Sequence, residues 1–286
     1  MTEGPIFDMV CRAISDDSRH RILRGHKFRC FDSQIDPSGQ CFATASEDGT
    51  VKIWHLATGQ PMAVLEHSAS EILRVCWSPF LHDSPEQYFA FGCADGTVHV
   101  YTYQTGSPCL LKPEGVLDHG DGSNDGQIYH CEFVVGDACR PQEEEDGKEH
   151  MPALQLVTAC DNLINMWDVK LLEKITCWEY PTIGENMIGG PRNPENISYV
   201  FGMALSRDKV AAALSDGTVR VNELKSKAPL AVLRLAREES QSHLTSVAWA
   251  PGGRRLAACA GNGAVHLWQE EERDAAGGGG GGGSGG

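Results

Sequence analysis

The clearest pattern in this 286-residue chain is a short motif in which a polar turn precedes alternating apolar positions. The turn begins with Asp or Asn, usually followed by Gly, and apolar residues then recur at every second position. An Asp-Gly pair favours a tight turn, and period-two alternation is typical of a β-strand with one buried face. The motif occurs as DGTVKIW from Asp48, DGTVHVY from Asp95, DNLINMW from Asp161, DGTVRVN from Asp216 and NGAVHLW from Asn262.

Two further strands are predicted before each motif. The nearer one consists largely of small residues, in the segments CFATAS, YFAFGCA, LQLVTAC, VAAALS and LAACAG. The other leads into a turn, as in ILRVCWSP and LTSVAWAPGG. Successive motifs begin 47, 66, 55 and 46 residues apart. None of these spacings is near twice the ~40–45 residues typical of such repeats, so five repeats are predicted.

This order of elements resembles the WD-repeat family, whose repeats carry a Gly-His pair early and a Trp-Asp pair late. Gly25-His26 and Trp167-Asp168 are the literal copies, and the resemblance covers residues 20–270. It implies an all-β fold, a WD-repeat β-propeller with five recognisable four-stranded blades. Residues 1–19 are then expected to be an N-terminal extension, and the Gly-rich residues 271–286 a disordered tail.

The two ends of the repeat region suggest how the ring closes. Residues 20–26 (HRILRGH) match PMAVLEH, the fourth strand expected before His67, whereas the last repeat stops after its third strand at Trp268. An N-terminal strand that completes the last blade would remove exposed sheet edges, which promote aggregation. A truncated chain, or a ring finished by a partner's strand, is the alternative.

The resemblance also implies a structural set in each blade: a His before the first strand, a Ser or Thr on the second, the turn Asp, and a Trp on the third. Buried polar groups cost about 1–3 kcal/mol each without a partner, and these four satisfy one another. Recurrence at buried positions argues against catalytic triads, which need one exposed site. The residues assigned to this set are His26, Asp48, Trp54, His67, Asp95, His119, Asp161, Trp167, Asp216, His243 and Trp268.

Some repeats depart from the set. The hydroxyl of the first repeat is Thr44 or Ser46, whereas the second repeat has Cys93 in its place. The fourth repeat has Asn222 where Trp belongs. We therefore expect looser packing in the fourth blade.

Composition narrows the function. The net charge of −15 repels phosphate backbones and anionic membranes, so direct nucleic-acid binding is not expected. No apolar stretch is long enough to span a bilayer, and no membrane insertion is predicted. Eleven cysteines, an odd number without a C-x-x-C pair, indicate buried thiols in a reducing compartment. A cytoplasmic or nuclear location is expected.

One segment matches a metal-binding spacing. Residues 121–132 (DGSNDGQIYHCE) fit a calcium loop with Asp121 and Asp125 as candidate ligands, but the same letters fit a turn that leads into a strand. The turn is the favoured interpretation, and no other metal site is indicated. The G-x-S-x-G match at residues 282–286 lies in the glycine tail, and phosphate-binding and H-E-x-x-H motifs are absent from the sequence. Neither enzymatic activity nor a cofactor is predicted.

The resemblance implies a protein-protein interaction scaffold that presents a rigid surface to partners within a multiprotein complex. Its partners would be other proteins. Binding residues are expected at the starts of the first strands and in the turns before the third strands, at Arg29, Glu47, Glu71, Tyr129 and Tyr199.

The alternative function is a substrate receptor of a cullin-4-type ubiquitin ligase. Residues 156–170 (LVTACDNLINMWDVK) resemble the box by which some WD-repeat proteins bind the ligase adaptor. Trp167, Asp168 and Lys170 carry that resemblance, with Lys170 as the candidate adaptor contact. Ordinary repeat sequence produces the same letters, and this simpler interpretation is favoured.

Overall fold

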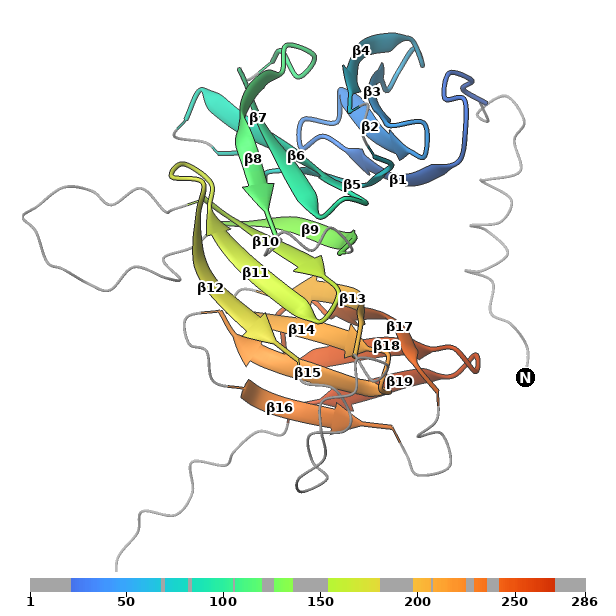
Figure 1. The fold of residues 1–286 in the computed structure, drawn as a ribbon, viewed down its shortest axis with the longest axis vertical. Helices are drawn as coiled ribbons and strands as arrows, with labels where there is room; N and C mark the ends of the chain where they lie inside the picture. The colour runs from blue at the N-terminus through green and yellow to red at the C-terminus, as the bar shows by residue number, and fades with distance from the viewer. Residues whose placement is uncertain are drawn as a thin grey trace, which may run out of the picture. The chain divides into compact units, whose positions relative to one another are not determined.

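A computed structural model describes residues 22–67, 70–81, 84–104, 106–119, 126–135, 154–180, 198–206, 208–224, 229–235 and 242–270. Every regular element in these ranges is a β-strand, nineteen in all (Figure 1). The prediction of an all-β fold is therefore confirmed. None of the described residues belongs to a helix with the length and apolarity needed to cross a membrane. The predicted extension at 1–19 and tail at 271–286 lie outside the described residues.

The chain divides into two compact units, and the first comprises the described residues up to Phe133 together with Val169–Glu173. It contains two antiparallel four-stranded sheets. One has the order β1 (Cys30–Ile35), β2 (Cys41–Ser46), β3 (Thr50–His55) and β4 (Pro61–Glu66). The other has the order β5 (Ile72–Trp77), β6 (Glu86–Cys93), β7 (Thr97–Gln104) and β8 (Lys112–Asp118).

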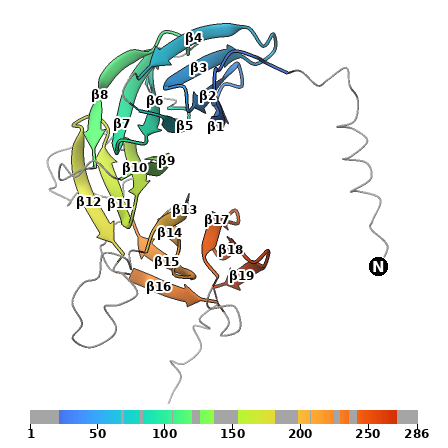
Figure 2. The same ribbon diagram turned by 45° about the vertical axis from the view of Figure 1, so that its right-hand side comes forward.

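The second unit comprises the described residues from Val134 to Asp168 and from Lys174 onward. One sheet has the order β12 (Glu173–Glu179), β11 (Leu163–Asp168), β10 (Leu154–Cys160) and β9 (Ile128–Val135), whose first residues belong to the first unit. The next has the order β13 (Val200–Leu205), β14 (Lys209–Leu214), β15 (Thr218–Glu223) and β16 (Pro229–Arg234). The last comprises β17 (Leu244–Trp249), β18 (Arg255–Ala260) and β19 (Val265–Gln269) (Figure 2).

Each unit has its own apolar core, built from alternating positions on neighbouring strands. In the first unit, Val51 and Ile53 on β3 are fully buried in a cluster that includes Phe89 on β6. In the second unit, the alanines of β14 (KVAAAL) are buried. A Cβ atom at Gly202 on β13 would lie 2.8 Å from Cα of Ser246 on β17, so backbone packs directly against backbone there. The small residues of β14 and Gly202 on β13 therefore allow the sheets to pack closely.

The repeated turn has the geometry that its sequence predicts. Gly49 has a φ of 71°, in the left-handed region that favours glycine, and a Cβ there would lie 2.7 Å from the carbonyl oxygen of His67. The third repeat has Asn in place of that Gly, and its Asp161 takes a φ of 49° instead. Asp enters the left-handed region more readily than most residues. Both variants of the turn therefore lead into a third strand.

The expected fourth strand of the last blade is not found. The sheet of β17, β18 and β19 has three strands among the described residues, and residues 22–26 form no strand. That segment lies instead against the first sheet, where a Cβ at Gly25 would lie 2.6 Å from the Trp54 ring. Val265 and Leu267 on β19 are 64% and 79% exposed, whereas the matching positions on the other third strands are buried. Val51 and Ile53, for example, are buried in a cluster with Phe89 of the next sheet.

Candidate functional site

A network of polar side chains joins three elements of the first sheet. Nε2 of His26 lies 2.7 Å from Oγ1 of Thr44 on β2, and its Nδ1 lies 3.1 Å from Oδ2 of Asp48. The indole Nε1 of Trp54 donates a hydrogen bond to the same Thr44 oxygen at 2.9 Å. The His26 and Asp48 side chains are only 5% and 4% exposed. The network therefore fastens the segment before β1 to the second and third strands.

The Asp48 carboxylate is the central acceptor of this network. It also accepts hydrogen bonds from the backbone N of Lys27 at 2.8 Å and from Oγ1 of Thr50 at 2.6 Å. Burial alone would raise the pKa of this carboxyl. The hydrogen bonds from Thr50, Lys27 and His26 outweigh burial, so the pKa lies well below its usual range. The carboxylate remains ionised at neutral and mildly acidic pH.

We expect acid to destabilise the first unit through this carboxyl. A group whose folded pKa lies below its unfolded pKa stabilises the fold above the unfolded value, about 3.9 for Asp. That stability decreases once pH falls below the unfolded pKa and is gone below the folded pKa, so part of it is lost by about pH 3. Urea unfolding at successive pH values from about 6 to about 3 should show a larger loss of unfolding free energy for the native chain than for Asp48→Asn. Equal losses in both proteins would contradict the role given to Asp48.

The second and third repeats keep parts of the network. Nε2 of His67 lies 2.9 Å from Oδ2 of Asp95. Thr44 pairs with Lys52 between β2 and β3, and Phe91 pairs with His99 at the same place between β6 and β7. The residue of the second repeat that corresponds to Thr44 is therefore Phe91 and not Cys93. In the third repeat, Nε1 of Trp167 donates to Oγ1 of Thr158 at 2.7 Å. His119 is buried, and Asp161 lies at the turn.

The fourth and fifth repeats depart further from the first. Asn222 is 4% exposed, and its Oδ1 accepts a hydrogen bond from the Tyr180 hydroxyl at 3.0 Å. Asp216 accepts hydrogen bonds from Thr218 Oγ1 at 2.6 Å and from Arg220 Nη2 at 3.2 Å. In the fourth repeat, other polar groups therefore form the hydrogen bonds at the positions of the structural set. In the fifth, His243 is exposed, and the Trp268 ring stacks on His266 with centroids 5.8 Å apart.

Polar contacts also join neighbouring first strands. Gln34 Oε1 on β1 accepts a hydrogen bond from the backbone N of Trp77 at 2.6 Å, and Nε1 of Trp77 donates to the carbonyl of Gln34 at 3.2 Å. In the second unit, Nε1 of Trp249 donates to the carbonyl of Ala204 at 3.2 Å. Sequence reasoning identified these tryptophans only as strand ends. The sequence signal that could have found them is a Trp directly before Ser-Pro in the second repeat and before Ala-Pro in the fifth.

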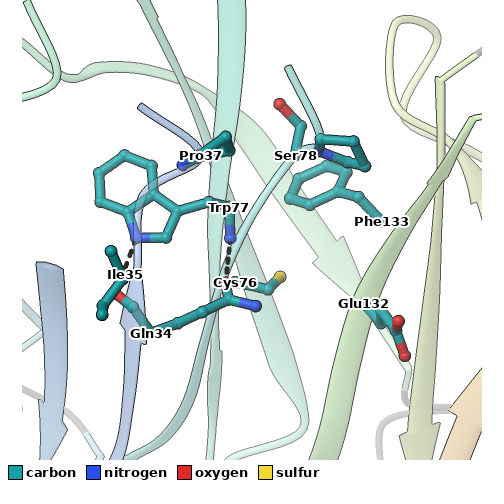
Figure 3. A pocket seen from close by; sticks show the side chains of 9 residues that line it. Gln34, Ile35, Pro37, Cys76, Trp77, Ser78, Glu132 and Phe133 are labelled. Atoms are coloured by element: carbon teal, nitrogen blue, oxygen red, sulfur yellow. Dashed lines mark hydrogen bonds between the residues drawn. The ribbon is translucent and has the colours of Figure 1, made fainter. Parts of the chain in front are cut away.

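A small pocket of about 180 Å³ lies near the ends of β1, β5 and β9 (Figure 3). This volume is below the ~300–1,000 Å³ typical of small-molecule sites, and it suits a single side chain. Sequence reasoning placed the binding residues at the opposite, starting ends of the first strands and missed this pocket. Its wall includes Ile35, Pro37, Trp77, Pro79, Glu132 and Phe133.

Three predicted partner-binding residues lie together: Arg29 and Glu71 directly precede the first strands β1 and β5, and Glu47 lies in the turn before β3. Nε of Arg29 donates to Oε2 of Glu47 at 2.8 Å, and this hydrogen bond is the main reason that the pKa of Glu47 is lowered. The same hydrogen bond is the largest cause of the raised pKa of Arg29, and the charge of Glu71 adds to it. The Arg29 side chain is 75% exposed, so this charged group is accessible.

The other candidates lie apart from that group. The backbone carbonyl of Tyr129 on β9 accepts a hydrogen bond from Nε of Arg74. Tyr199 is 39% exposed, and its ring stacks on Phe201 with centroids 6.4 Å apart. Lys170 is exposed after β11. The calcium candidates Asp121 and Asp125 lie outside the described residues.

Comparison with known proteins identifies a matching family and similar proteins. Residues 17–55 and 233–269 match the family described as WD domain, G-beta repeat. A stretch of 59 residues, 20% of this chain, is 41% identical to ribosome biogenesis protein erb1 of Aspergillus clavatus, of which it covers 8%. A stretch of 58 residues is 36% identical to the ribosome biogenesis protein BOP1 homolog of Monosiga brevicollis and covers 7% of that protein.

These matches agree with the architecture. Both family matches fall on segments that contain the repeated motif, and all five sheets are antiparallel with three or four strands. The part of this chain that matches covers less than a tenth of the length of either relative. The repeated motif, the sheets and the family matches together show that this chain contains WD repeats.

Proposed function

We propose that the chain is a non-catalytic scaffold that binds other proteins within a complex for ribosome assembly. The names of the two relatives, both ribosome biogenesis proteins, support the assembly process and a nuclear location. The observation that carries the binding role is the pocket near the ends of β1, β5 and β9. Its small volume and partly apolar wall suit the side chain of a partner protein.

The chemistry of the pocket suggests what enters it. Ile35 at the wall is 56% exposed, and the adjacent Phe80 is 40% exposed. Exposed apolar groups around a pocket are typical of interaction sites, where one buried anchor supplies much of the binding energy. Glu132 adds a carboxylate on one side. The fitting partner is an exposed protein segment with an apolar side chain next to a basic one.

The test is affinity purification of the tagged full-length chain, followed by sedimentation of the bound material. We expect the chain to sediment with ribosome precursors and to keep its protein partners after RNase treatment. Ile35→Glu places a charge at the pocket wall and should weaken partner binding at least about tenfold, equivalent to about 1.4 kcal/mol. The matched control is Val116→Glu, because Val116 is also an aliphatic strand residue, 51% exposed on β8.

Each part of the proposal can fail separately. A chain that never sediments with ribosome precursors would contradict the assembly role. Full partner binding by Ile35→Glu would show that the pocket is not the binding site. Loss of all partners on RNase treatment would instead indicate binding through RNA, against the expectation from the acidic net charge of −15.

No comparison supports the ubiquitin-ligase alternative. Trp167 and Asp168 are buried in β11, where they are part of the sheet, and Lys170 is exposed. The same purification with Lys170→Glu tests the alternative directly. Only retention of the cullin-4 adaptor by the native chain, together with its loss from this variant, would support a receptor function.

A further inference from the structure

Two imidazoles and a thiol converge in the second sheet. His67 follows β4, Cys93 ends β6, and His99 lies on β7. One ligand atom from each residue, a ring nitrogen or Sγ, lies within 4.8 Å of the others. The β6–β7 register pairs Phe91 with His99, so Cys93 and His99 are diagonal neighbours on one face of the sheet. No other group of three such side chains is this close among the residues that the structure describes.

These ligand types are those that bind zinc. Thiolate sulfur and imidazole nitrogen are borderline to soft donors, and Zn–S and Zn–N bonds of about 2.3 and 2.0 Å place neighbouring ligand atoms roughly 3.5 Å apart. Small side-chain rotations would bring the three atoms from their present separation to that distance. Oδ2 of Asp95 lies 2.9 Å from Nε2 of His67, and a carboxylate that holds an imidazole in this way commonly supports metal ligation.

The convergence is specific to the second repeat. The positions of Cys93 and His99 are occupied by Ser46 and Lys52 in the first repeat, and by Ala260 and His266 in the fifth. The His99 ring stacks on Phe91 with centroids 4.9 Å apart, which orients the imidazole. Ions can reach the group from solvent, because the side chains of His67 and Asp95 are 17% and 30% exposed.

We propose that His67, Cys93 and His99 bind one transition-metal ion of the zinc class, with Asp95 supporting His67. The site lies in the second sheet and is independent of the proposed ribosome-assembly role. It departs from the prediction of no metal beyond the calcium candidate, because ligands spread over three separate elements leave no short motif in the sequence.

The probes are Zn²⁺ and Co²⁺ added to the purified full-length chain under reducing conditions. We expect one equivalent of Co²⁺ to produce a thiolate-to-cobalt charge-transfer band, and one equivalent of Zn²⁺ to abolish it. Cys93→Ser, which introduces the residue of the first repeat, should remove the band. His99→Lys, also the residue of the first repeat, should weaken Co²⁺ binding at least about tenfold. Zn²⁺ should raise the melting temperature of the native chain but not that of Cys93→Ser.

Two matched controls test whether these effects are specific. Cys160→Ser removes another buried thiol next to a turn Asp, and His266→Lys removes the histidine at the position of His99 in the fifth sheet. Both should bind Co²⁺ like the native chain. Circular dichroism without metal should show that Cys93→Ser is folded. A native chain without the charge-transfer band, or a band that persists in folded Cys93→Ser, would overturn the proposal.

Discussion

Replacing Trp77 with alanine should lower the free energy of unfolding of the first unit by about 3–5 kcal/mol. The indole is 4% exposed and packs against Phe89 and Tyr103, with ring centroids 4.4 Å and 5.3 Å away. Its loss leaves a cavity and removes the hydrogen bond to Gln34 on the neighbouring strand β1. Urea unfolding followed by circular dichroism measures the change.

Trp77→Phe separates packing from hydrogen bonding. Phenylalanine keeps most of the apolar contact but cannot donate to the Gln34 carbonyl, so we expect a loss of only about 1–2 kcal/mol. If Trp77→Ala and Trp77→Phe destabilise the unit equally, packing against Phe89 is not the dominant contribution. If neither destabilises it, Trp77 does not link β5 to β1 in solution.

The second large effect is expected for Asp48→Asn, which should destabilise the first unit by about 2–4 kcal/mol at neutral pH. The amide has the shape of the carboxylate but no charge, and its NH₂ group cannot accept a hydrogen bond. Lys27, Thr50 and His26 then all lose a charged acceptor, and at least one of them loses its acceptor altogether, in a site where the side chain is 4% exposed.

The control for this prediction is Asp208→Asn. Asp208 is exposed in the bend before β14, and substitutions at such positions usually change stability by less than about 0.5 kcal/mol. Both variants lose one negative charge, so a general charge effect would appear in both. A stability of Asp48→Asn equal to that of Asp208→Asn would show that the buried network does not hold the first sheet together.

The sequence alone determined the local structure of this protein. Asp-Gly turns and period-two apolar residues are properties of a few neighbouring positions, and they predicted the second and third strands of all five repeats. The family resemblance added the roles of His26, Asp48 and Trp54, which the structure brings together around Thr44. Asp48 and Trp54 could be found because the Trp follows the turn residue at the same spacing in the first, third and fifth repeats, whereas His26 was recognised from its Gly-His pair.

Only the tertiary structure decided how the strands meet. Register placed Phe91 and not Cys93 at the hydroxyl position, and packing between sheets paired Trp77 with Gln34 and Tyr180 with Asn222. It also left Val265 and Leu267 exposed on a three-stranded sheet and brought His67, Cys93 and His99 together. These contacts join residues from separate elements, and their partners depend on strand alignment and side-chain volume, which local periodicity does not contain.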